Sequence, residues 1–210
     1  MISHGDLFLK AMGCGLAVAA PVGPMALLCM RRTLVRGWKH GLATGGGIAF
    51  GDACYALVAA LGLSGVSSFM LTHERVLHAV AGLFLIYLGI KTFRSHVAAD
   101  GTAPADAKPL SAWPSVFGSS VLLTLTNPPT IIMFAAIFTV LAPHTGFTLP
   151  AALATVGGVF AGSLLWWVGV TAVVLLMRGA IGPRIRLWID RIAGVILTLF
   201  GALELRKAAP

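Results

Sequence analysis

A single acidic residue stands deep inside an apolar run of this chain. Asp52 lies near the middle of the run from Gly41 to Ser64, and no other Asp or Glu is placed at that depth. A carboxylate in hydrocarbon costs several kcal/mol unless it is paired, hydrated or protonated, so a functional role is the default expectation. Such a group suits the binding of a proton on one side of a membrane and its release on the other. The alternative is a structural carboxyl that caps broken backbone nearby.

Two groups of prolines predict breaks in apolar helices. Pro21, Gly23 and Pro24 interrupt one run, and Asn127 and Pro128 interrupt another. Proline removes a backbone donor and clashes with the preceding turn, so each run should kink or unwind. The freed N–H groups and the positive end of the helix dipole suit an anionic group such as a carboxylate. A purely structural kink is the alternative, because proline is common in membrane helices.

The elements that position these residues must cross a membrane. Hydrophobic residues make up 58% of the 210-residue chain and charged residues only 10%, with a mean hydropathy of +0.92. A membrane-spanning helix needs about 20 apolar residues. Six runs approach that length: Leu7–Met30, Gly41–Ser64, Val76–Phe93, Ser115–Leu141, Leu149–Met177 and Leu187–Leu205. The sequence predicts an all-α integral membrane protein with six transmembrane helices, the first and fourth broken at the prolines.

The two halves of the chain resemble each other. Residues 42–51 align with residues 153–162, and residues 80–89 align with residues 192–201. Small and aliphatic residues match by chance in many membrane proteins, but two matches in register, with a further match between the first helices, favour an internal repeat. A repeated three-helix unit must enter the membrane from opposite faces. This predicts an inverted-topology repeat of the kind found in secondary transporters.

The repeat also sets the expected domain organisation. A first three-helix repeat covers residues 1–94, a polar cytoplasmic linker covers residues 95–113, and a second three-helix repeat covers residues 114–210, all within one membrane domain. Glycines one turn apart allow close helix contact. Those expected to serve helix packing are Gly47, Gly51, Gly158 and Gly162.

The charged residues indicate orientation and not a nucleic-acid surface. The net charge is +8, but the basic residues stand in short clusters between apolar runs and form no basic, aromatic-interleaved surface. The clusters within residues 31–39, 91–108 and 178–186 share one side, so the bias of Lys and Arg predicts a cytoplasmic (inner) membrane location with both termini outside. We expect Asp190 to form a local ion pair and Glu204 to reach water. No nucleic-acid partner is expected.

Other reactive residue types predict no catalytic or metal site. Cys14, Cys29 and Cys54 lack the spacing of a disulfide framework or a zinc site and are expected to pack inside the helices. The segment Gly62–Gly65 has the G-x-S-G form of rhomboid-type membrane proteases, but no histidine is placed to act as its base. We therefore expect no enzyme activity, no organic cofactor and no resident metal.

Four segments, in order along the chain, resemble the LysE/RhtB family of amino-acid exporters. The first, "PVGPMALLCMRRTLVRGWKHGLATGGGIAFGD", has a P-x-G-P start, a basic segment and a G-D pair. The others are "YLGIKTFRS", "LLTLTNPPTIIMF" and "WIDRIAGVILTLFGALEL". Together they cover nearly the whole chain. Val22, within a P-V-G-P version of the motif, and Pro129 depart from the commonest family pattern.

The resemblance implies export of amino acids or close derivatives across the cytoplasmic membrane, driven by a proton or other ion gradient. The substrate carboxylate is then expected at the broken helix ends, and the coupling proton or the substrate ammonium at Asp52. The two halves would rock about that site to alternate access. The motif positions carried over are Pro21, Gly23, Pro24, Asp52, Asn127 and Pro128.

A metal-cation exporter of a related six-helix family is the alternative function. Metal ions prefer clustered carboxylate, His or Cys ligands, and one buried Asp with scattered Cys residues makes a poor cage. The lipid bilayer, an amino acid and a coupling ion are thus the expected partners. The sequence leaves open which amino acid moves, which ion is coupled and whether the protein forms a homo-oligomer.

Overall fold

A computed structural model of the chain describes residues 3–20, 23–61, 72–94, 112–127, 130, 133–134, 148–179 and 182–208. Within these residues the protein is all-α, as predicted, with seven helices and no strand. The helices are α1 (His4–Ala19), α2 (Pro24–Arg36), α3 (Trp38–Ala60), α5 (Glu74–Phe93), α6 (Ala112–Leu125), α8 (Leu149–Arg178) and α9 (Pro183–Ala208).

Three of these helices are long and apolar enough to cross a membrane by themselves. They are α3, α5 from Arg75, and α8, and the pair α1 and α2 would add a fourth span. α6 is apolar but shorter, and most of its predicted continuation to Leu141 lies outside the described residues. Large apolar side chains such as Leu83 and Leu176 are 60% and 85% exposed, which suits a surface in contact with lipid. The six-span count stays a prediction.

The first predicted helix is two helices and not one. α1 ends at Ala19 and α2 begins at Pro24, and the two are bent by 83° relative to each other. Pro24 lies in the first turn of α2. A backbone N–H at this position would have no acceptor inside the helix, so its absence in proline breaks no hydrogen bond. α2 then continues to Arg36, past the predicted end at Met30. Pro21 lies outside the described residues.

The basic segment predicted to lie between two helices is itself helical. Arg31, Arg32 and Arg36 belong to α2, Lys39 belongs to α3, and Gly37 alone separates the helices. Gly37 has φ 86°, a value that favours glycine because it carries no Cβ. Arg31 and Arg32 can stay in the helix because each has hydrogen-bond partners in other helices. The predicted gap between the first two helices is therefore wrong, whereas the orientation that these basic residues indicate stays a prediction.

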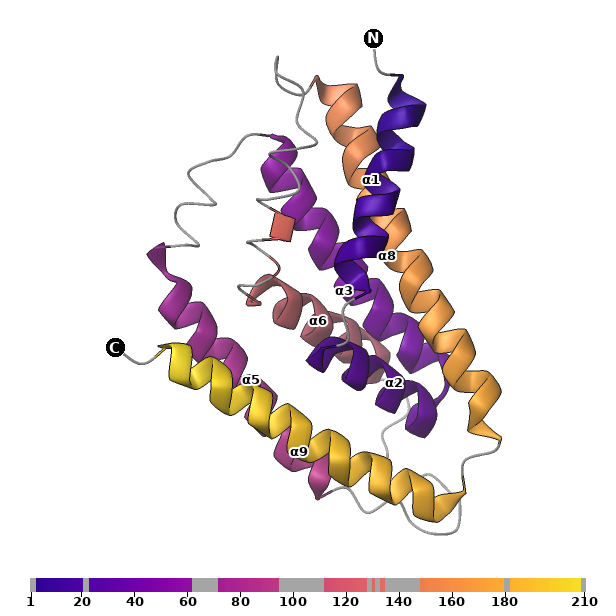
Figure 1. Cartoon of the computed structure of the whole chain (residues 1–210), viewed down its shortest axis with the longest axis vertical. Helices are drawn as coiled ribbons and strands as arrows, with labels where there is room; N and C mark the ends of the chain where they lie inside the picture. The colour runs from indigo at the N-terminus through magenta and orange to yellow at the C-terminus, as the bar shows by residue number, and fades with distance from the viewer. Residues whose placement is uncertain are drawn as a thin grey trace.

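The helices form two pairs, α1 with α8 and α5 with α9, and the other helices pack against these pairs (Figure 1). α1 runs along α8, and α5 runs along α9. α3 lies between α8 and α6, while α2 contacts α3, α8 and α9. The short helices α2 and α6 thus lie between the long pairs.

Glycines allow the backbones to touch at these contacts. A Cβ at Gly158 would collide with the backbone oxygen of Phe8 in α1, and a Cβ at Gly47 would lie 2.6 Å from the backbone oxygen of Phe117 in α6. Gly47 and Gly158 are aligned positions of the two halves. The contact of α3 with α6 therefore has the same form as the contact of α8 with α1.

The contact between α5 and α9 is reciprocal. A Cβ at Gly82 would lie 2.8 Å from the oxygen of Gly201, and one at Gly89 would lie 2.8 Å from the oxygen of Gly194. Gly82 aligns with Gly194 and Gly89 with Gly201. Exchanging the two halves would therefore exchange these two contacts.

Substitution of a packed glycine tests this close approach. Gly162→Ala places a methyl group against the backbone of Met12, so we expect a loss of about 1–3 kcal/mol, as for overpacked cores. Gly169→Ala is the matched control in the same helix, because no neighbouring atom would lie within 4 Å of the added Cβ. The measurement is the thermal unfolding midpoint in detergent. Equal midpoints for the two variants would contradict the packing.

Candidate functional site

Asp52 is buried in α3 and faces α8. Its side chain is 2% exposed, and its Oδ2 accepts a hydrogen bond from Ser163 Oγ at 2.7 Å. No Lys, Arg or His forms an ion pair with it within the described residues. An acid buried without a counter-charge is costly as an anion, so this site favours a bound proton or a bound cationic group.

The two partners of this hydrogen bond occupy matching places in the two halves. The alignment of residues 42–51 with residues 153–162, extended by one residue, pairs Asp52 with Ser163. The sequence analysis did not single out Ser163, although this register pointed to it. At this aligned position the first half carries the carboxyl of Asp52 and the second half carries the hydroxyl of Ser163, and the two side chains are in contact.

The break in the first helix lies one turn from this hydrogen bond. Trp167 follows Ser163 by four residues on the buried face of α8, a rise of roughly 6 Å. It belongs to a buried cluster with Ala19, at the end of α1, and Ala26, in the first turn of α2. Gly23 and Pro24, at the start of α2, are therefore close to this cluster.

Trp167 carries an unused hydrogen-bond donor in this cluster. The residue is 2% exposed, and its indole Nε1 is buried without a hydrogen-bond partner in the described part of the chain. A buried polar group without a partner is rare and suggests a ligand or water. Trp167 lies in the core, whereas Trp113 and Trp188 are 60% and 61% exposed.

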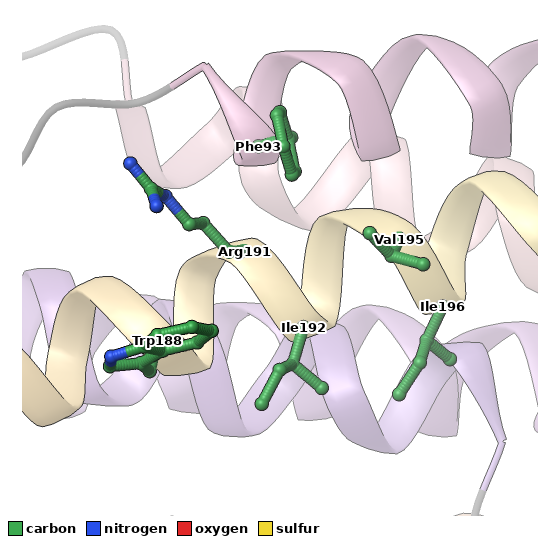
Figure 2. Close-up of a pocket in the computed structure, with 6 residues that line it drawn as sticks. All are labelled: Phe93, Trp188, Arg191, Ile192, Val195 and Ile196. Atoms are coloured by element: carbon green, nitrogen blue, oxygen red, sulfur yellow. The ribbon is translucent and has the colours of Figure 1, made fainter.

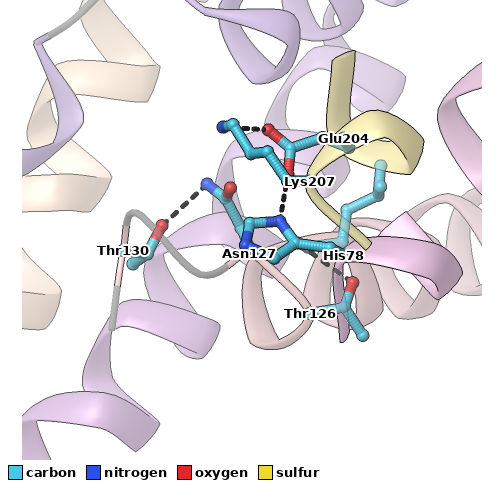
Figure 3. Close-up of polar contacts among 7 residues, drawn as sticks. His78, Thr126, Asn127, Thr130, Glu204 and Lys207 are labelled. Carbon is cyan, nitrogen blue, oxygen red and sulfur yellow. Dashed lines mark hydrogen bonds and ion pairs between the residues drawn. The ribbon is translucent and has the colours of Figure 1, made fainter. Parts of the chain in front are cut away.

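The end of α6 approaches the same region from the other side. Tyr55, three residues after Asp52, donates its hydroxyl proton to the backbone oxygen of Leu125 at 2.6 Å. Leu125 is the last residue of α6, so Tyr55 ties α3 to the point where the fourth predicted helix ends. Asn127 Nδ2 donates to Thr130 Oγ1 at 2.8 Å (Figure 3). The amide of Asn127 is thus engaged within its own segment.

Asp52 lies one turn along α3 from Tyr55, which bonds the end of α6. Its partner Ser163 lies one turn along α8 from Trp167, which packs in the cluster beside the start of α2. Pro128, like Pro21, lies outside the described residues. The packing glycines lie in α3 and α8 against neighbouring helices, with Gly51 against Thr124.

Two further charged clusters contain groups that the sequence analysis treated as local. Asp190 is 1% exposed and pairs with Arg31 of α2 at 2.7 Å, so its partner is not local. Glu204 was expected to reach water, but it is 9% exposed and pairs with His78 of α5 and with Lys207 (Figure 3). That expectation was wrong because α9 packs this carboxylate against α5.

A surface groove and the distribution of metal-ligating side chains indicate no metal site within the described residues. A groove is lined by Phe93 of α5 and by residues of α9 including Trp188 and Ile192 (Figure 2). Its walls are largely apolar and half-exposed, which suits lipid contact. No group of three His, Cys, Asp or Glu residues able to hold a metal occurs in the part of the chain that the structure describes.

The LysE type translocator family model matches residues 16–207 of the chain. The chain belongs to this family. The match includes both break regions and Asp52, together with the helices that position them. Some relatives are named as efflux proteins, which are transporters. The apolar, membrane-spanning helices of this chain agree with a transporter.

Several relatives carry names. The leucine efflux protein of Salmonella typhimurium (strain LT2) is 27% identical over 128 residues, 59% of each chain. The putative amino acid efflux protein YcgF of Bacillus subtilis is 26% identical over 202 residues, 93% of each chain. An uncharacterized membrane protein of Synechocystis is 29% identical over 126 residues, 60% of each chain. The chain thus matches about three fifths of the first relatives' length. No solved structure matches it.

A double-mutant cycle measures the central hydrogen bond. Ser163→Ala leaves the Asp52 carboxyl buried without its partner, so we expect a loss of about 1–3 kcal/mol in the free energy of unfolding. The same substitution should cost clearly less in an Asp52→Ala background, because the two side chains are coupled. Both values come from denaturant unfolding in detergent. Identical costs in the two backgrounds would show that the hydrogen bond contributes nothing.

Proposed function

We propose that this LysE family member is a secondary transporter that exports amino acids or close derivatives across the cytoplasmic membrane. The observation that carries the proposal is the buried acid Asp52, which has no counter-charge among the described residues and is bonded to Ser163. The names of the relatives support the substrate class, and leucine is the first amino acid to test. The structure offers no support for the metal-cation alternative within the described residues.

The substrate carboxylate is proposed to bind at the start of α2. The first N–H groups of a helix have no partner inside the helix and carry a partial positive charge. Trp167 Nε1 adds a buried donor beside Ala26, in the first turn of α2. A carboxylate accepts several hydrogen bonds at once, so it would satisfy both kinds of donor.

Asp52 is proposed to bind the coupling proton or the substrate ammonium. The carboxyl is stable in hydrocarbon when protonated or when a cation lies against it. Ser163 holds Oδ2 in place, which leaves the rest of the carboxyl for that cation. Release of the proton on the other face would then free the site for the next cycle.

Alternating access is proposed to use the inverted repeat. The reciprocal glycine contacts and the pairing of Asp52 with Ser163 support two halves related by a two-fold axis through the site. Residues 1–94 and 114–210 would rock against each other about this hydrogen bond. A site on the axis stays in place while the halves move.

The proposed orientation places both termini outside. Arg178, at the end of α8, lies beside Gly37, between α2 and α3, and Phe93 of α5 lies with Trp188 of α9. With the pair of Arg31 and Asp190, which joins α2 to α9, these contacts support a common side for the basic segments. Lys and Arg are retained on the cytoplasmic side of inner-membrane proteins.

Efflux from proteoliposomes tests the function. Purified protein is reconstituted with a mixture of labelled amino acids inside, a pH gradient is imposed, and efflux of each amino acid is followed. We expect selective, gradient-dependent efflux that falls by at least about tenfold in Asp52→Asn, a change of about 1.4 kcal/mol. Asp6→Asn is the matched control because Asp6 is exposed in α1.

The outcomes separate the parts of the proposal. No efflux of any amino acid would overturn amino-acid export. Efflux by Asp52→Asn at the wild-type rate, with unchanged dependence on the pH gradient, would remove Asp52 from the coupling step and leave the substrate class standing.

Trp167→Phe tests the donor at the start of α2. The substitution removes Nε1 but keeps an aromatic ring in the cluster, so the unfolding midpoint should change little. If Nε1 donates to the substrate, KM for efflux should rise by roughly threefold to tenfold, the value of one hydrogen bond. An unchanged KM with normal stability would assign Trp167 to packing alone.

A further inference from the structure

Arg32 of α2 is a part-buried cation that pairs with no acid in the described residues. Its guanidinium donates to neutral oxygens: Nη1 to Thr44 Oγ1 at 3.2 Å and to Ser120 Oγ at 3.0 Å, and Nη2 to Ser119 Oγ at 3.1 Å. A longer contact of 3.5 Å joins Nη1 to the oxygen of Val116. Three helices thus hold the cation without neutralising it.

The neighbouring arginine shows the contrast. Arg31 pairs with the carboxylate of Asp190 at 2.7 Å. Around Arg32 the hydroxyls are themselves fixed, because Ser119 and Ser120 each donate to the Val116 oxygen at 2.8 Å. Their lone pairs therefore face the guanidinium, but a neutral oxygen cannot supply the missing counter-charge.

One edge of the guanidinium is unoccupied by any acceptor in the described chain. Thr44 and Ser120 accept from Nη1 and Ser119 accepts from Nη2, which leaves the N–H of Nε and one N–H of Nη2 without an acceptor in the described residues. Adjacent N–H groups of this kind form the fork that binds a carboxylate through two parallel hydrogen bonds. Arg32 retains some exposed surface, so this edge is reachable.

A second unmatched group lies on the same face of α3. Thr44 donates its hydroxyl proton to the backbone oxygen of His40, one turn earlier in the helix, so the two side chains share a face. Both ring nitrogens of His40 are buried without a hydrogen-bond partner in the described residues. Buried polar atoms normally have partners, so the ring of His40 is a second group that a ligand could contact.

We propose that Arg32 binds the carboxylate of the amino acid before it reaches Asp52. This inference rests on the proposed function. Arg32 lies eight residues after Pro24 in α2, roughly 12 Å from the helix break, and toward the side proposed for the basic segments. A substrate that enters from the cytoplasm meets this guanidinium first, and its carboxylate then passes to the start of α2.

Chemical protection tests the site in the unaltered protein. Phenylglyoxal, which modifies arginine, is applied to the reconstituted protein in phosphatidylcholine vesicles, and modification of Arg32 is measured by mass spectrometry. Leucine should protect Arg32, whereas leucinamide, which lacks the carboxylate, should not. Equal protection by both compounds, or protection that appears only when anionic lipid replaces phosphatidylcholine, would overturn the proposal.

Variants give an independent readout. Arg32→Gln should raise KM for leucine efflux by at least about tenfold, the value of a charge-assisted pair, and Arg32→Lys should recover part of this loss. Arg36→Gln, which removes an exposed charge one turn further along α2, is the matched control and should leave KM unchanged. The unfolding midpoint of each variant reports any loss of the contacts between α2, α3 and α6.

The outcomes separate this inference from the proposed function. Wild-type efflux with an unchanged KM in a folded Arg32→Gln variant would overturn the carboxylate site alone. Absence of wild-type efflux would overturn the proposed function itself. Should Arg32→Gln fail to fold, the protection experiment on the wild-type protein still decides.

Discussion

Hydrocarbon offers no hydrogen-bond partners, so every polar group in the membrane must be satisfied by the protein itself. Most of this chain meets that constraint with helices packed closely at glycines, as at Gly47 and Gly158. Among the described residues, Asp52 and Arg32 have hydrogen bonds but no opposite charge. The buried atoms there without a hydrogen-bond partner are Trp167 Nε1, both ring nitrogens of His40 and Asp190 Oδ2. Because unsatisfied groups are expensive there, Asp52, Trp167 and Arg32 mark where something other than protein is expected to bind.

The three groups belong to α2, α8 and α3, which contact one another. Arg32 is on α2 near α6, Trp167 lies beside the start of α2, and Asp52 is one turn from it across α8. Two of them suit a carboxylate and one suits a cation. An amino acid carries both charges at neutral pH, and this charge pattern agrees with the family of the chain.

The near-symmetry of the halves makes their differences informative. Gly82 contacts Gly201 as Gly194 contacts Gly89, so the α5 and α9 helices meet alike from either half. At the centre, however, Asp52 faces Ser163, and a symmetric pair of acids would repel. The unequal pair keeps a single titratable group where the two halves meet. The glycine contacts thus occur in both halves, whereas the ionisable carboxyl at this position occurs in the first half only.

The sequence by itself determined the membrane class, the apolar helices α3, α5 and α8, the family and the isolation of Asp52 along the chain. These depend on local composition, on the order of motifs and on the absence of a nearby charge. Only the tertiary structure decided the partners. Arg31 and Asp190 are 159 residues apart and Asp52 and Ser163 are 111 apart, and no local pattern states which distant side chains meet. Glu204 was misjudged for that reason: its burial depends on α5, which packs against it only once the chain has folded.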